Sequence, residues 1–146
     1  MRQHNVNHIE YFTFTTKILS GVQHAVSTRK GGCSTGACAS LNVGQHSSDS
    51  LNNITENRTR ICRAAGLPSE NFLCMQQAHS DRVANIRADS QETVAGTLCQ
   101  EGLPHTDAIV TDVKNLTLMG KSADCPLILL FDPHLPAIAL IHSGRE

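Results

Sequence analysis

Aromatic residues make up only 3% of the 146 residues, and tryptophan is absent. A core must therefore be built mainly from aliphatic side chains, and hydrophobic residues of all kinds reach 40% of the chain. That content, with 17% charged residues, is typical of a globular protein rather than a disordered one. A chain of this length fits one domain, so we expect a single domain over residues 1–146.

An excess of charge and a long apolar run are also missing. The formal net charge is −1, so neither a nucleic acid polymer nor an anionic membrane surface is an expected partner. No uninterrupted apolar run approaches the ~18 residues typical of a membrane-spanning helix, and residues 1–10 have no apolar signal-peptide core. We expect a soluble, cytoplasmic protein.

None of the six cysteines belongs to a CxxC pair. They stand at positions 33, 38, 62, 74, 99 and 125. Without a CxxC pair, the sequence lacks the usual pattern of a zinc ribbon or a thioredoxin-like site. Without a secretion signal we expect reduced thiols rather than disulfides, and all but Cys125 should be ordinary packing or surface residues.

The first half of the chain predicts a hairpin followed by a long loop. Residues 10–16 and 22–28 alternate polar residues with β-branched or aromatic ones around a Ser20-Gly21 turn, which indicates a hairpin. Residues 29–50 contain four glycines and little apolar periodicity. We expect a loop there, of the kind that often carries function.

A helix is predicted next, over residues 51–65. Its apolar side chains recur at three- and four-residue spacing, Asp49 or Ser50 is the expected N-cap, and Gly66 is the stop signal.

The second half predicts strands. Those expected from β-branched and apolar residues are 72–77, 82–87, 107–111 and 116–119, with residues 89–105 irregular. Residues 126–131 and 137–142 are nearly continuous apolar runs, which is typical of buried strands joined by a short connection. Because little chain follows the last run, we expect it to lack neighbours and to favour self-association through an incomplete sheet.

Three potential metal ligands lie at the ends of these expected elements: His79, Cys125 and His142. One thiolate and two imidazoles suit zinc or copper, and three protein ligands leave a fourth position open, as in catalytic zinc sites. The spacing also permits a plainer interpretation, in which Cys125 is a small buried residue and both histidines are hydrogen-bonded imidazoles. From the residues alone, both interpretations stay open.

A series of short motifs extends these observations along the chain: Ser27-Thr-Arg-Lys-Gly-Gly32, Ser34-Thr-Gly36, Ser40-Leu-Asn-Val-Gly44, Asn57-Arg58, Gln77-Ala-His79, Thr106-Asp-Ala108, Ser122-Ala-Asp-Cys-Pro126 and Ile141-His-Ser-Gly144. Their order resembles the laccase-domain family, once described as multicopper polyphenol oxidases and now regarded as purine nucleoside phosphorylases. The resemblance runs from about Val22 to Gly144. It implies an α/β fold, a layered sandwich with mixed β-sheets.

The resemblance also implies a site. In that family the histidine of Q-x-H, the cysteine of A-D-C and the histidine of H-[AS]-G bind the metal, which carries over to His79, Cys125 and His142 as catalytic and metal-binding residues. The implied cofactor is zinc, with copper as the alternative. The implied substrates are phosphate and a purine nucleoside, either adenosine, inosine or methylthioadenosine, with adenosine deamination as a second activity.

Substrate contacts are expected on the loop and the helix. Arg29 and the neighbouring Gly31-Gly32 offer a guanidinium and approachable amides for phosphate. Asn42 is a candidate for the ribose or base, and Arg58 for phosphate, although each has an alternative role as a loop, turn or helix residue. Asp124 is a candidate hydrogen-bond acceptor for a metal-bound histidine.

One departure from the family concerns the end of the sequence. Family members continue after H-[AS]-G with a tryptophan and a further C-terminal half, so the resemblance implies a C-terminally truncated member whose fold is incomplete and whose activity alone is low. Two alternative functions stay open. One is a hydrolase with Cys125 as nucleophile and His142 as base; the other is a metal-binding domain that catalyses no reaction.

Overall fold

The computed structural model describes residues 1–45, 47–89 and 101–144. The chain falls into two units, Met1–Glu70 and Asn71–Glu146, each with its own internal contacts. The expectation of a single domain stays a prediction. Most of the stretch expected to be irregular, residues 90–100, lies outside the described residues. Within the described part of the chain, no helix has the length and apolar character needed to cross a membrane.

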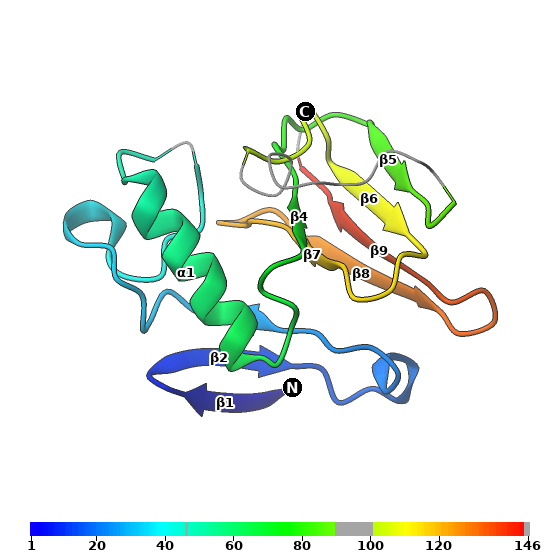
Figure 1. Ribbon diagram of the computed structural model, residues 1–146, viewed down its shortest axis with the longest axis horizontal. Coiled ribbons are helices and arrows are strands. Elements are labelled where there is room, and N and C mark those ends of the chain that lie inside the picture. Colours follow the sequence, from blue (N-terminus) through cyan, green and yellow to red (C-terminus); the bar gives the residue numbers. More distant parts are fainter. Residues whose placement is uncertain (46, 90–100, 145–146) are drawn as a thin grey trace. The chain divides into compact units, whose positions relative to one another are not determined.

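The first unit combines a small sheet with one helix (Figure 1). Its elements are β1 (Arg2–Val6), β2 (Ile9–Thr13), the 3-10 turn η1 (Lys17–Leu19), β3 (Val26–Ser27), the 3-10 turn η2 (Gly36–Cys38) and α1 (Leu51–Ala64). The sheet is antiparallel, in the order β1-β2-β3. The predicted hairpin is confirmed as the β2-β3 pair, with shorter strands than expected. The sequence does not predict β1, because this strand is polar except for Val6.

The helix α1 has a serine as its N-cap, and a glycine follows its C-terminal cap residue, Ala65. Ser50 Oγ accepts a hydrogen bond from the Asn53 backbone at 3.2 Å, so Ser50 rather than Asp49 is the N-cap. Ile54 and Ile61 are buried on one side of the helix. Gly66 follows with a φ of 68°, a left-handed conformation that costs glycine little. The predicted helix is therefore confirmed.

The described residues of the second unit form two sheets. Its strands are β4 (Phe72–Cys74), β5 (Val83–Ile86), β6 (Ala108–Thr111), β7 (Thr117–Met119), β8 (Leu127–Asp132) and β9 (Ala137–His142). β4 and β7 form a parallel pair, and the larger sheet has the order β5-β6-β9-β8. In that sheet β5 and β6 are parallel and the other pairs antiparallel. These strands match the predicted ones to within a few residues, and the mixed sheets agree with the expected α/β class.

The core of this unit covers one face of the larger sheet. Ile109 and Leu140 from its central strands pack with Leu73 and Met75, and Leu129 joins them from β8. All but Leu129 are buried. Each fully buried side chain of this size contributes roughly 1.5–3 kcal/mol, so the aliphatic core expected from the composition holds this sheet in place.

The opposite face of the same sheet is apolar but open. Ile128, Leu130 and Val83 are 41%, 52% and 59% exposed. The prediction that residues 126–131 form a buried strand is wrong, because side chains in a strand alternate between faces and the described residues cover only one of them. The expectation that the last strand lacks neighbours is also wrong: β9 pairs with both β6 and β8.

Candidate metal centre

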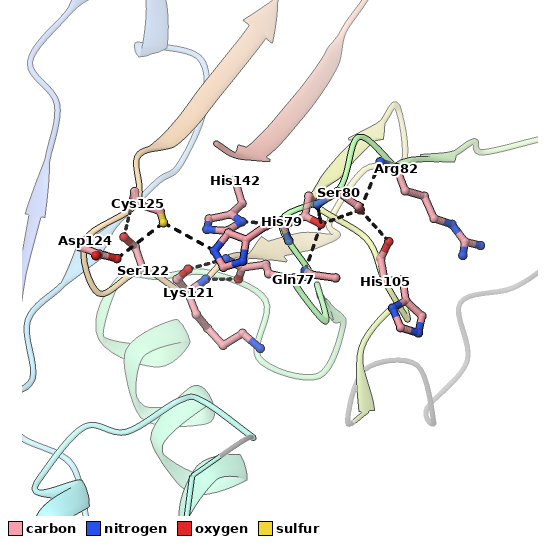
Figure 2. A network of polar contacts seen from close by, with 12 residues as sticks. Gln77, His79, Ser80, Arg82, His105, Lys121, Ser122, Asp124, Cys125 and His142 are labelled. Carbon is pink, nitrogen blue, oxygen red and sulfur yellow. Dashed lines mark hydrogen bonds and ion pairs between the residues drawn. The ribbon is translucent and has the colours of Figure 1, made fainter. Parts of the chain in front are cut away.

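His79, Cys125 and His142 lie together in the second unit, and their ligand atoms are within 4.8 Å of one another. His79 lies in the turn after β4, Cys125 lies just before β8, and His142 ends β9. The antiparallel register places Leu127 opposite His142, which brings Cys125 beside that histidine. Figure 2 shows the three side chains converging from these three segments. Sequence reasoning thus identified the cluster, while its role as a metal site stays a prediction.

His142 is buried, and its ring is hydrogen-bonded to the carboxylate of Asp107. Its Nδ1 lies 2.7 Å from Asp107 Oδ1. Burial would raise the pKa of Asp107, but hydrogen bonds from His142 and from Ser80 and Ala78 outweigh it and hold that pKa well below its ordinary value. The ionised carboxylate only accepts hydrogen bonds, so His142 Nδ1 carries the proton and Nε2 is the nitrogen left for a ligand.

His79 has an unusual backbone conformation, with a φ of 57°. Its N–H donates to Asp107 Oδ1 at 3.1 Å, and the N–H of Ser80 donates to Oδ2 of the same carboxylate at 2.9 Å. These bonds hold the turn in a left-handed conformation that costs a non-glycine residue free energy. Gly144 lies against the ring, which leaves no room for a side chain at that position.

The loop that carries Cys125 is tied to the segment that carries His79. Gln77 Nε2 donates to the Lys121 carbonyl at 2.6 Å, and the Lys121 N–H donates to Gln77 Oε1 at 2.8 Å. The Ser122 hydroxyl donates to the Cys125 carbonyl and closes the loop. The Cys125 Sγ then lies 3.7 Å from His79 Nε2. Gln77 therefore links two of the three candidate ligands.

The carboxylate beside His142 is not the one expected from the sequence. Asp124 accepts a hydrogen bond from the Cys125 thiol at 3.6 Å, and the structure places Asp107 against His142 instead. Asp107 belongs to the Thr106-Asp-Ala108 motif, but neither its type nor its spacing singles it out. Its position follows from strand pairing, because the next residue, Ala108, lies opposite Ile141.

The three side chains fit a zinc or copper ion in donor type, and their ligand atoms all lie within 4.8 Å of one another. Zinc bonds of about 2.0–2.3 Å in tetrahedral geometry separate neighbouring ligand atoms by roughly 3.5 Å. The distance of 3.7 Å between Cys125 Sγ and His79 Nε2 is close to that value. The buried carboxylate behind His142 is the usual partner of a metal-binding imidazole.

Arg29 belongs to the first unit, where its exposed side chain holds the loop. Nε donates to the Ala39 carbonyl at 2.9 Å, and a terminal guanidinium nitrogen donates to the same oxygen. The neighbouring Lys30 forms an ion pair with Glu10 at 3.3 Å. The phosphate contact expected of Arg29 stays a prediction.

Asn42 and Arg58 also have partners inside the first unit. Asn42 Nδ2 donates to Ser47 Oγ at 2.8 Å and to Asp49 Oδ2 at 3.0 Å, and its Oδ1 accepts the N–H of Gly44. Arg58 is buried, and its guanidinium donates to the Val43 carbonyl at 2.9 Å. These contacts organise the loop ahead of α1. The substrate contacts expected of both residues stay predictions.

Asp49 is the acceptor on which this loop converges. Its carboxylate accepts hydrogen bonds from Ser34 Oγ at 2.5 Å, from Asn42 and from Asn53 Nδ2 at 2.8 Å. These bonds, that from Ser34 foremost, lower the pKa of Asp49 to about 2. The sequence predicts Asp49 only as a possible helix cap, because Ser34 and Asn42 reach it from other parts of the loop.

Known proteins resemble the chain along most of its length. The family model described as multi-copper polyphenol oxidoreductase laccase matches residues 23–146. A purine nucleoside phosphorylase of Corynebacterium glutamicum is 35% identical over 127 residues, which cover 85% of this chain and 48% of that protein. A purine nucleoside phosphorylase of Bacteroides thetaiotaomicron is 32% identical over 125 residues, or 86% of this chain and 46% of that protein. The chain spans about half the length of the curated relatives it matches.

Solved structures show the same fold. YlmD from Geobacillus stearothermophilus is 26% identical and superimposes with a TM-score of 0.84, covering 97% of this chain and 52% of YlmD. A Neisseria meningitidis protein is 27% identical with a TM-score of 0.63, covering 96% of this chain and 47% of its own. These matches confirm the α/β fold that the sequence motifs imply.

Proposed function

The chain belongs to the multi-copper polyphenol oxidoreductase laccase family, and we propose that it carries the metal centre of a metal-dependent purine nucleoside phosphorylase. The observation that carries this proposal is the convergence of His79, Cys125 and His142, with Asp107 behind His142. The names of the relatives in Corynebacterium and Bacteroides support the reaction. The substrates we propose are phosphate and adenosine, inosine or methylthioadenosine.

In the proposed reaction, a phosphate oxygen forms a bond to the anomeric carbon of the ribose while the bond to the purine nitrogen breaks. The electron pair of that bond leaves with the purine, which takes up a proton, and the products are the free base and ribose 1-phosphate. A bound zinc or copper ion would supply Lewis-acid chemistry for the negative charge that develops. His79, Cys125 and His142 would hold that ion.

We propose Arg29 as the phosphate contact. Its side chain is exposed, and a guanidinium binds phosphate through charge-assisted hydrogen bonds. Asn42 and Arg58 are weaker candidates for substrate contact, because Asn42 is half-buried and Arg58 is buried, whereas Arg29 is exposed. Adenosine deamination is a further proposed activity, in which water replaces the amino group and ammonia leaves.

The experiment that tests this function is product analysis with and without inorganic phosphate. The chain is loaded with zinc and incubated with inosine or adenosine. Free base and ribose 1-phosphate should form only when phosphate is present, and Cys125→Ser should abolish this while Cys38→Ser, at another half-buried free thiol, should not. Base release that does not depend on phosphate would mean hydrolysis, and inosine with ammonia from adenosine would mean deamination.

A cysteine hydrolase is the second candidate, because the Cys125 thiol lies 3.7 Å from an imidazole nitrogen. That nitrogen belongs to His79, whereas the sequence favours His142 as the base. Chelation distinguishes the two functions. A hydrolase would retain its activity without metal and lose it on thiol alkylation, and a phosphorylase centred on zinc would lose it on chelation. A domain that binds zinc and shows neither activity would support the third, non-enzymatic alternative.

We also propose that the chain self-associates through the open face of its larger sheet. Ile128, Leu130 and Val83 share this face. Strands about 4.8 Å apart that rise about 3.3 Å per residue give a face of roughly 300–400 Å². A stable interface buries about 800 Å² on each partner. Self-association through this face alone should therefore be weak and dependent on protein concentration.

A further inference from the structure

Both oxygens of the Asp107 carboxylate are occupied by the segments that carry two candidate metal ligands. Oδ1 accepts from His142 Nδ1 at 2.7 Å and from the His79 N–H at 3.1 Å. Oδ2 accepts from the Ala78 N–H at 3.1 Å and from the Ser80 N–H and hydroxyl at 2.9 and 2.8 Å. Asp107 itself is buried, as is His142, whereas His79 and Ser80 are exposed.

The main chain of Asp107 is bound as well. Its carbonyl accepts the His142 N–H at 2.7 Å, and its own N–H donates to the Arg82 carbonyl at 3.1 Å. Asp107 therefore joins the end of β9 to the turn that follows β4, and its side chain has little freedom to move. One carboxylate contacts two ligand-bearing segments that are far apart in sequence.

We propose that Asp107 is a positioning residue for the metal centre, which holds His142 in the tautomer with Nε2 free and holds His79 in its left-handed turn. The inference rests on the proposed metal site and deepens it. Asp107 touches neither substrate nor metal; it acts through the orientation of His142 and the backbone of His79. A carboxylate suits both tasks because it only accepts hydrogen bonds, and every group around it is a donor.

The substitution Asp107→Asn distinguishes this role from simple packing. Asparagine has nearly the same shape as aspartate, but the NH₂ group of its amide is a hydrogen-bond donor. If the amide nitrogen faces His142, it donates to Nδ1 and moves the proton to Nε2, which blocks the nitrogen left for a ligand. If it faces Ser80 instead, it meets the N–H groups of the turn and displaces His79. Either orientation should weaken metal binding without creating a cavity.

The experiment measures the tautomer of His142 and the affinity for zinc. Imidazole ¹⁵N shifts are recorded on the metal-free chain, and zinc is then titrated against a competing chelator. The variants are Asp107→Asn and Asp107→Glu, with Asp112→Asn as the matched control. Asp112 follows the opposite end of β6 and accepts from the Ala88 N–H, so it tests the loss of a carboxylate away from the ligands.

We expect the proton on His142 Nδ1 in the wild-type chain, and a zinc affinity about ten- to a hundredfold lower in Asp107→Asn with Asp112→Asn unchanged. Asp107→Glu should restore part of the affinity. A wild-type His142 protonated on Nε2 would overturn the inference even if Asp107→Asn failed to fold. So would an unchanged zinc affinity in a folded Asp107→Asn. A wild-type chain that bound no zinc would refute the proposed function, while the ¹⁵N shifts would still decide the tautomer.

Discussion

Gly144 lies against the imidazole of His79, so closely that a Cβ at position 144 would stand 1.9 Å from His79 Cδ2. Carbon atoms in contact are normally about 3.5–4.0 Å apart, so any side chain here must move the ring. Ligands of a metal site must be held to within about 0.5 Å of the productive geometry. Gly144 is therefore required by the position of His79.

We predict that Gly144→Ala lowers the affinity for zinc by about ten- to a hundredfold, comparable to the loss of a supporting hydrogen bond. Competition with a chelator measures the change. Ser143→Ala is the control, because Ser143 is exposed and its N–H, which donates to the Pro126 carbonyl, is kept. Equal affinities in Gly144→Ala and the wild type would show that His79 is not a ligand in this orientation.

Arg29→Ala should slow any phosphorolysis by about ten- to a hundredfold, since a charged hydrogen bond to phosphate contributes roughly 1.5–3 kcal/mol. Arg2→Ala, at an exposed position of β1, should leave the rate unchanged. Because Arg29 also bonds to the Ala39 carbonyl, the melting temperature is measured alongside. If the lower rate of Arg29→Ala is fully explained by a lower melting temperature, Arg29 does not contact phosphate.

The low pKa of Asp49 leads us to predict that the fold loses stability in acid. Its pKa in the folded chain is about 2, below the ordinary value of 3.8, so the ionised carboxylate stabilises the fold at every pH above about 4. This contribution fades as the pH falls from about 4 towards 2. The free energy of unfolding of Asp49→Asn should lie below that of the wild type near neutral pH, and the difference should shrink in acid. A difference that is constant with pH would contradict the assignment.

Leu130→Lys should abolish self-association, because it places a charge on the open apolar face, at its most exposed leucine. Leu135→Lys is a matched control: Leu135 is 75% exposed but lies in the turn between β8 and β9, away from the face. Sedimentation over a range of concentrations measures the effect. If both variants associate as the wild type does, the sheet face is not the interface.

Much of the fold follows from local patterns. The period of α1 and the apolar runs of β8 and β9 are visible in the sequence because each packs one side against a core. The polar strand β1 is not visible, since its hydrogen bonds to β2 rather than its side chains define it. The sequence overstates the burial of β8 for a related reason: a run of apolar residues does not reveal how many faces of a strand are covered.

The candidate site also has residues that the sequence reveals and residues that it does not. His79, Cys125 and His142 carry a recognisable chemistry, so motifs suffice to find them. Asp107 and Gly144 support that chemistry through a carboxylate behind one ring and a missing side chain beside another. Neither role has a local sequence signal, because both arise from the pairing of β6 with β9 and from the path of the chain after β9.

Titration with cobalt(II), which substitutes for zinc and gives visible and near-ultraviolet absorption, tests whether His79, Cys125 and His142 form a metal centre. We expect about one cobalt ion per chain, with absorption typical of a tetrahedral site and a thiolate-to-cobalt charge-transfer band. Cys125→Ser should remove the charge-transfer band, His79→Ala and His142→Ala should weaken binding, and Cys38→Ser should change neither. A chain that bound no cobalt, or whose charge-transfer band survived in Cys125→Ser, would contradict a metal centre formed by His79, Cys125 and His142.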